Sequence, residues 1–188
     1  MNKIIITFLI IVGYLNIQAQ TTFITKNGKI TFDATTANSP EKIVGINEKA
    51  ASKLDISTGT IEFAVLMKAF SFEKALMQEH FNENYVESDQ FPKAIFKGNI
   101  VNISAVDLKK DGSYTVNIKG TLTLHGETKE ITTEGVLVVK DHNVVSAKSK
   151  FNIPLEDYKI MIPSLVKDKV AKDAQIIIET NYLPYKSS

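Results

Sequence analysis

The segment Tyr114–Leu124 reads YTVNIKGTLTL and shows the clearest alternation of apolar and polar side chains in the chain. One face carries Tyr114, Val116, Ile118, Leu122 and Leu124, and the opposite face carries only Thr, Asn and Lys side chains. A two-residue period over this length is typical of a strand that buries one face in a core. The triplet His125-Gly126-Glu127 follows directly and indicates a tight hairpin turn.

Six further segments are rich in branched residues or alternate in a similar way. They are Lys29–Thr35, Thr60–Phe70, Ala94–Ile103, Lys129–Val139, Val144–Ile153 and Ala174–Tyr182. Turn signals at Lys110-Asp111-Gly112-Ser113 and Asp141-His142-Asn143 separate neighbouring segments. Successive strands joined by short turns indicate an up-and-down antiparallel sheet, which closes most simply as a barrel. We therefore predict an all-β protein built as an antiparallel up-and-down β-barrel of about eight strands.

Two stretches interrupt the strand pattern. We predict one short α-helix over residues 71–86, with Ser71 as its cap, because Phe72, Leu76 and His80 would share a face. The stretch Pro154–Lys172 contains two prolines and predicts short turns. The segment Glu41–Asp55 is unusually polar, and we assign it no strand.

We expect residues 1–19 to be a cleavable signal peptide. Lys3 gives the N-terminal region of the signal peptide a positive charge, and Ile4–Leu15 forms its apolar core. Ile17-Gln18-Ala19 fits the small-residue pattern of a cleavage site. The apolar core is shorter than the roughly 20 residues that a membrane-spanning helix needs. We therefore expect a periplasmic or secreted protein without a stable membrane span.

The length of the expected mature chain, residues 20–188, indicates a single domain. The chain contains no Cys, which excludes disulfides, thiolate chemistry and a lipid-anchored cysteine. Without Lys3 the basic and acidic residues balance at 21 each, and all the basic residues are lysines. Nucleic-acid binders usually carry a basic excess or a basic face, so we predict no nucleic-acid partner.

The barrel interior is the candidate functional site. The apolar residues that could line it are Phe63, Val65, Met67, Phe96, Leu122 and Phe151. An eight-stranded barrel either fills its interior with side chains or holds one small ligand, and both readings are open from these residues alone. The first predicts a ligand-free interaction or scaffold module, and the second predicts a protein that binds a hydrophobic molecule.

Polar chemistry is sparse in the sequence. His80 and Glu83 have a spacing found in some metal sites, but His125 and His142 fall in predicted turns, so we predict no metal. Two other roles for His80 are open: a structural hydrogen bond to a backbone carbonyl near Asp89, or a contact with a ligand's head group. The sequence contains no Gly-x-Ser-x-Gly motif of the kind that presents a nucleophilic serine. We therefore predict no catalytic residue, no cofactor and no enzymatic activity. The alternative is a hydrolase or isomerase that uses the same pocket.

Three groups of motifs resemble the YceI-like family over roughly Lys29 to Leu183. They are Met77-Gln78-Glu79-His80-Phe81 with Ser88-Asp89 and Phe91-Pro92-Lys93-Ala94-Ile95-Phe96; the hairpin Gly120-Thr121-Leu122-Thr123-Leu124-His125-Gly126-Glu127-Thr128; and Phe151-Asn152-Ile153-Pro154-Leu155 with Tyr158-Lys159-Ile160.

The resemblance implies a lipocalin-like barrel in the periplasm or outside the cell. It also implies a long apolar cavity for a polyisoprenoid-type lipid, a quinone precursor or a similar amphiphile, which favours the ligand-binding reading. By analogy with the family, the ligand's head group would lie near the cavity mouth, beside His80 and Lys93. Members of the family are often dimeric, so a homodimer is a further expectation.

Overall fold

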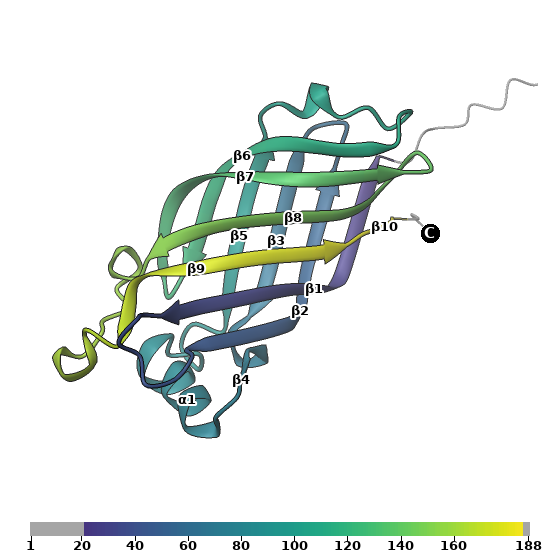
Figure 1. Ribbon diagram of the computed structural model, residues 1–188. Helices are drawn as coiled ribbons and strands as arrows, with labels where there is room; N and C mark the ends of the chain where they lie inside the picture. Colours follow the sequence, from purple (N-terminus) through teal and green to yellow (C-terminus); the bar gives the residue numbers. More distant parts are fainter. Residues whose placement is uncertain (1–20, 186–188) are drawn as a thin grey trace, which may run out of the picture.

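The hairpin predicted around His125 and Gly126 forms the longest strand pair of the computed structural model, which describes residues 21–185 (Figure 1). Strand β6 (Gly112–Leu124) pairs with β7 (Glu127–Lys140) along its full length. His125 and Gly126 have φ values of 50° and 78°. Positive φ at both positions is the geometry of a two-residue type I′ turn, whose twist matches that of the strands.

Eight strands close the barrel in an up-and-down arrangement. In addition to β6 and β7 they are β1 (Thr22–Thr35), β2 (Val44–Asp55), β3 (Thr60–Leu66), β5 (Lys93–Ile100), β8 (Asn143–Pro154) and β9 (Val170–Asn181). Each pairs antiparallel with its neighbours in the order β1-β9-β8-β7-β6-β5-β3-β2, and the pairing of β2 with β1 closes the ring. This confirms the predicted all-β barrel of about eight strands.

Strand β2 lies in the segment to which the sequence analysis assigned no strand, and that assignment was wrong. Its inward positions include Asn47 and Ser52, so it lacks apolar alternation although both residues are buried. The Asn47 side chain donates to the backbone carbonyl of Leu66 at 2.9 Å. The Ser52 hydroxyl is hydrogen bonded to the Tyr182 hydroxyl at 2.7 Å. These partners satisfy polar groups that would otherwise be costly to bury.

The helical segment is shorter than predicted. Helix α1 spans Ala75–His80, follows Lys74 as its N-cap, and continues as a π-helical turn over Phe81–Tyr85. Ser71 is therefore not the cap. It belongs to the two-residue strand β4 (Ser71–Phe72), which pairs with β2. The Ser71 hydroxyl also donates to the carbonyl of Ile46 at 3.1 Å.

Smaller corrections concern strand ends. The strand predicted over Thr60–Phe70 ends at Leu66, and a 3₁₀ turn over Met67–Ala69 follows it. The strand predicted over Ala94–Ile103 ends at Ile100. A second two-residue strand, β10 (Leu183–Pro184), pairs with β1.

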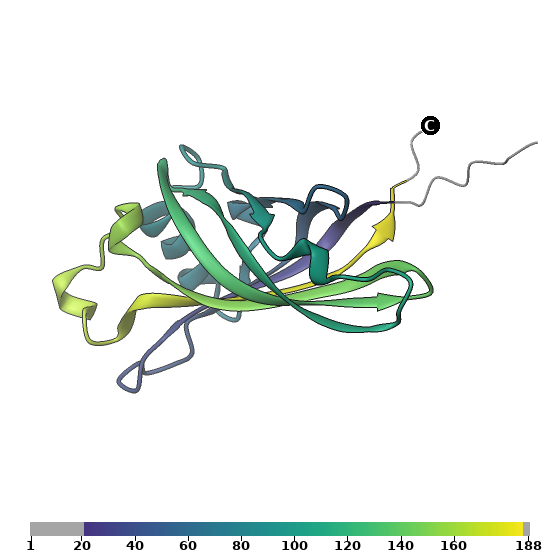
Figure 2. The ribbon, with the colours of Figure 1, turned by 90° about the horizontal axis from the view of Figure 1, so that it is seen from above.

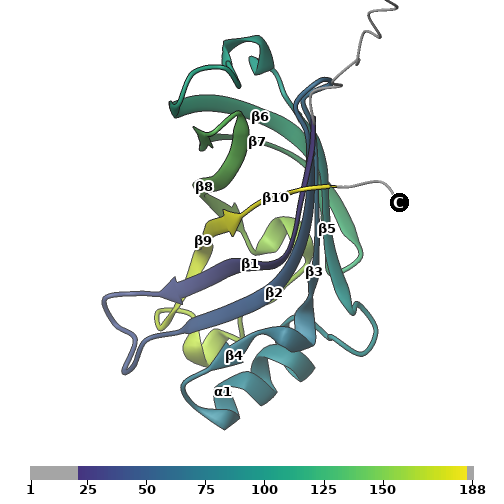
Figure 3. The same ribbon diagram turned by 90° about the vertical axis from the view of Figure 1, so that its right-hand side faces the viewer.

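One end of the barrel carries most of the irregular structure. Helix α1, the β1–β2 loop and the segment between β8 and β9 all extend from this end, which we call the α1 end (Figures 2 and 3). The predicted turns between β8 and β9 include 3₁₀ turns over Glu156–Tyr158 and Ser164–Val166. The opposite end carries the β7–β8 turn and both ends of the described chain (Figure 2).

The buried side chains form two clusters along the barrel axis. One packs around Phe23, Leu54 and Leu137 and fills the end opposite α1. The other packs around Phe81 and Tyr158 at the α1 end. Buried side chains therefore pack toward both ends of the barrel, and the space inside the barrel that could hold a ligand's chain lies between the clusters.

Candidate functional site

A cavity of about 130 Å³ lies inside the barrel between the two clusters. All six residues proposed from sequence to line an interior space are in its wall: Phe63, Val65, Met67, Phe96, Leu122 and Phe151. They come from β3, the 3₁₀ turn after it, β5, β6 and β8. The structure thus brings these residues together around one space, and their contact with a ligand remains a prediction.

The wall of this interior cavity is almost entirely apolar. The polar side chains among its lining residues are Thr133, Lys148 and Ser149, which lie on β7 and β8. Lys148 is exposed and bonds Glu179 at 3.0 Å, so its charge is directed to the outer surface. An apolar cavity of roughly 150 Å³ stays dry and takes up benzene, so this space suits a hydrocarbon group.

A second cavity of about 390 Å³ opens at the α1 end. Its polar lining residues are Glu41, Lys74, His80, Tyr85 and Lys169. Glu41 and Lys74 form an ion pair, and this hydrogen bond raises the pKa of Lys74. Burial raises the pKa of the Tyr85 phenol. The outer cavity therefore offers a cation and a neutral phenol beside an apolar wall.

Phe81 is buried and lies between the two cavities, because it lines both, as do Phe32, Val86, Leu155 and Ile160. Its ring lies 5.6 Å from that of Phe32, 5.4 Å from that of Phe70 and 4.9 Å from that of Phe72, centroid to centroid. Tilted aromatic pairs at such distances stabilise one another beyond the area they bury. The aromatic cluster is thus a packed partition between the interior cavity and the outer cavity.

The two residues proposed for a head group occupy different places. His80 is exposed on α1 and lines the outer cavity. Lys93 is exposed at the start of β5 and is absent from the described lining of either cavity. Its neighbour Ala94 faces the interior, and side chains alternate along a strand, so Lys93 faces outward. The sequence analysis suggested a bond from His80 to a backbone carbonyl near Asp89. In the structure the Asp89 carboxylate forms an ion pair with Lys68.

The sequence analysis missed Glu41, Lys74 and Lys169. These residues come from three irregular segments that are far apart in the chain and meet only at the α1 end. The periodicity of side chains within one segment does not predict which distant segments will lie next to each other. Their charge alone would not have distinguished them from the other lysines and glutamates of the surface.

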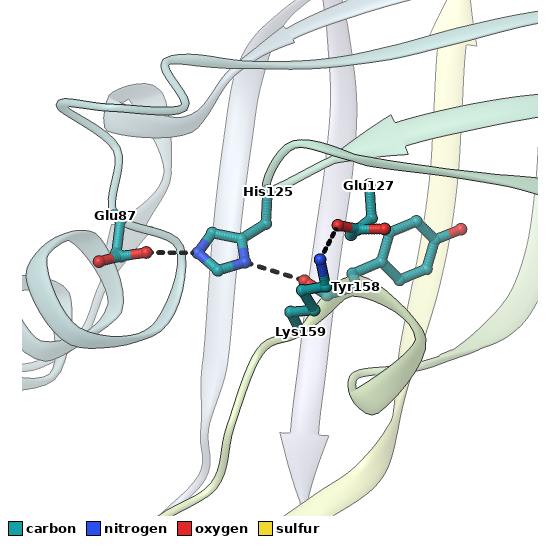
Figure 4. Close-up of polar contacts among 5 residues, drawn as sticks. All are labelled: Glu87, His125, Glu127, Tyr158 and Lys159. Atoms are coloured by element: carbon teal, nitrogen blue, oxygen red, sulfur yellow. Dashed lines mark hydrogen bonds and ion pairs between the residues drawn. The ribbon is translucent and has the colours of Figure 1, made fainter.

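Polar contacts tie the β6–β7 turn to the segments around it (Figure 4). His125 Nδ1 donates to the backbone oxygen of Tyr158 at 2.8 Å, and its Nε2 lies 2.8 Å from a carboxylate oxygen of Glu87. Lys159 Nζ lies 2.5 Å from a carboxylate oxygen of Glu127, and this bond lowers the pKa of Glu127. We call these five residues the His125 cluster.

Tyr158 contributes its backbone to the His125 cluster and its ring to the core. The ring is buried, and burial, with the nearby charge of Asp157, raises the pKa of its hydroxyl to about 12. The phenol is therefore neutral at physiological pH. Within residues 21–185, no group of three or more potential metal ligands comes together, and no helix is both long and apolar enough to cross a bilayer.

A closed eight-stranded antiparallel barrel around an apolar space defines a lipocalin-like class of fold. The model of the YceI-like domain matches residues 15–182, and the chain belongs to this family. A comparison with curated proteins finds no match.

Several solved structures share the fold at low sequence identity. A polyisoprenoid binding domain from Saccharophagus degradans, implicated in plant cell wall breakdown, has a TM-score of 0.73 and 11% identity, covering 88% of this chain and 99% of that one. BcnA of Burkholderia cenocepacia has a TM-score of 0.62 and 16% identity, covering 83% and 96%. The YceI protein of Campylobacter jejuni has a TM-score of 0.56 and 14% identity, covering 81% and 90%.

Proposed function

We propose that this protein binds a hydrophobic or amphiphilic molecule and sequesters or carries it, with the ligand's apolar chain in the interior cavity. The observation that carries the proposal is the unfilled apolar space inside the barrel, which a scaffold module with a filled barrel would not have. A polyisoprenoid-type lipid or quinone precursor is the proposed ligand class, supported by the polyisoprenoid binding described for the Saccharophagus degradans domain.

The outer cavity is the proposed position of the ligand's polar head group. His80, Lys74 and Lys169 line it and can donate hydrogen bonds to head-group oxygens. Lys93 faces away from both cavities, so it is not part of this proposal. A head group in the outer cavity and a chain in the interior cavity require the partition around Phe81 to move or to be bypassed.

We propose a binding role without catalysis, in the periplasm or outside the cell. The polar side chains of the interior cavity are two hydroxyls and one outward-directed lysine, which is no arrangement for acid–base or nucleophilic chemistry. The proposed location depends on the signal peptide expected at residues 1–19, which lie outside the described residues.

The proposal predicts that affinity depends on the length of the ligand's chain. In a series of linear alcohols, each added methylene should strengthen binding by about 0.8 kcal/mol, or roughly fourfold, until the cavity is full. Competition against an environment-sensitive fluorescent lipid would give the dissociation constants. Affinities that stay constant along the series, or the absence of competition, would contradict burial of the chain as the source of binding.

A further inference from the structure

The barrel wall is not continuous between β7 and β8. These strands pair from Lys140↔Asn143 to Gly135↔Ser149, and there the pairing stops. Within residues 21–185, Glu127–Glu134 of β7 pairs only with β6, and Lys150–Pro154 of β8 pairs only with β9. Two strand edges therefore face each other without a backbone ladder, and we call this region the β7–β8 slot.

The slot leads into the interior cavity. Ile131 and Thr133 on its β7 edge, and Ser149 and Phe151 on its β8 edge, all line that cavity. These inward-facing side chains are only half-buried, whereas Leu137, farther along β7 where the ladder is intact, is 1% exposed. The interior cavity therefore meets the surface along the slot.

A second place where neighbouring barrel strands separate is closed. Between β2 and β3 the pairing ends at Ala51↔Ala64. Beyond it, β4 pairs with β2, and Met67 and Phe70 of the following turn are both 5% exposed. Buried side chains thus fill that gap, whereas side-chain polar contacts close the β7–β8 slot.

Those polar contacts lie at the two ends of the slot. At the end farther from α1, where the pairing of β7 with β8 stops, the Ser149 hydroxyl donates to the backbone oxygen of Glu134 at 2.6 Å. At the α1 end the His125 cluster joins the 3₁₀ turn after β8 to the start of β7, through Lys159–Glu127 and His125–Tyr158 (Figure 4). The Lys159 and Glu127 side chains are 74% and 28% exposed, and ion pairs of this kind contribute little to stability.

We propose that the ligand's apolar chain enters and leaves the barrel sideways through the β7–β8 slot, and that the His125 cluster is the latch that closes it. This inference rests on the proposed function and adds the route. Opening the slot breaks a few side-chain contacts and no strand ladder. The slot reaches the α1 end, so an amphiphile can keep its head group there while its chain passes between the strands, without displacing the partition around Phe81.

Crosslinking across the latch tests the route. The chain has no Cys, so paired substitutions give unique sites. The variant Glu127→Cys/Lys159→Cys, joined by a bis-maleimide, ties the turn after β8 to β7. The matched control, Lys119→Cys/Glu130→Cys, replaces an ion pair of 3.7 Å on the other edge of β7, where the strands are already laddered. Stopped-flow fluorescence of a dansylated fatty acid gives the rates of uptake and release.

We expect the latch crosslink to slow uptake and release at least about tenfold with little change in affinity, and the control crosslink to change neither. Lys159→Ala, which loosens the latch without a crosslink, should speed both rates severalfold. Equal rates for the two crosslinked proteins, with normal binding, would overturn the slot as the route. Failure of the unmodified protein to bind the probe would instead overturn the proposed function.

Discussion

Replacing Val65 with Trp should reduce the affinity for a long-chain ligand about 100-fold. Val65 is 9% exposed and lines the interior cavity from β3. The indole would occupy the space proposed for the chain. Excluding about four methylenes at about 0.8 kcal/mol each removes roughly 3 kcal/mol of binding free energy, which is about two decades in the dissociation constant. Competition with a fluorescent lipid measures the loss.

Leu66→Trp is the matched control for this prediction. Leu66 is the next residue of the same strand, faces the opposite side of the sheet and is 46% exposed. The same substitution there should leave affinity within about twofold, since it adds no atoms to the cavity. Full-strength binding by Val65→Trp, with the variant folded, would show that the ligand lies elsewhere.

Replacing Gly120 with Ala should lower the free energy of unfolding by about 3 kcal/mol, or Tm by roughly 6–12 °C. Gly120 on β6 faces Gly98 on β5. A Cβ at Gly120 would lie 2.4 Å from the backbone oxygen of Lys97 and 2.5 Å from the Cα of Gly98. Neither atom belongs to a side chain that can rotate away, so the two strands would have to separate. Thermal and urea denaturation measure the effect.

Gly135→Ala is the milder control for Gly120→Ala. A Cβ at Gly135 would lie 3.1 Å from the nearest atom, the backbone oxygen of Lys148, so a shift of a few tenths of an ångström relieves it. We expect a loss of about 1 kcal/mol or less. Equal stability of the Gly120→Ala and Gly135→Ala proteins would contradict the close approach of β5 and β6.

The strands that sequence predicted well have a clear division between an apolar inner face and a polar outer face. Strands β6 and β7 are of this kind, and the turn at His125-Gly126 fixes their register. Strand β2 was missed because Asn47 and Ser52 occupy inward positions, where they are satisfied by Leu66 and Tyr182. Leu66 ends β3 and Tyr182 directly follows β9, so no local pattern in β2 reveals that its polar residues are buried.

The interior cavity follows from the same alternation, since every residue predicted to line it faces inward on a strand or on the turn directly after one. The outer cavity could not be predicted in this way. Its polar residues Glu41, Lys74 and Lys169 come from separate irregular segments. Lys93 was placed beside His80 at the cavity mouth only by analogy with the family, and it lines neither cavity. The hydrogen bonds by which His125 joins separate segments could not be predicted either. Its position in a turn does not indicate a partner as distant in the chain as Glu87.

The slot gives a physical reason for the irregular segment between β8 and β9. Where β8 leaves β7, the wall must be closed by contacts other than a backbone ladder. The 3₁₀ turn over Glu156–Tyr158 supplies them through the Tyr158 carbonyl, while its aromatic ring anchors the turn in the core. A few polar contacts thus hold shut the part of the barrel through which the ligand is proposed to pass.

Native mass spectrometry of the protein purified from its own host, followed by organic extraction, tests the central claim most directly. Binding of an apolar molecule in the barrel predicts a discrete excess mass on the folded protein and an extractable lipid of the same mass. The Val65→Trp protein, prepared in parallel, should lack that excess mass while Leu66→Trp retains it. An excess mass that survives unchanged in Val65→Trp, or a bare protein mass together with failure to take up any added lipid, would contradict the account.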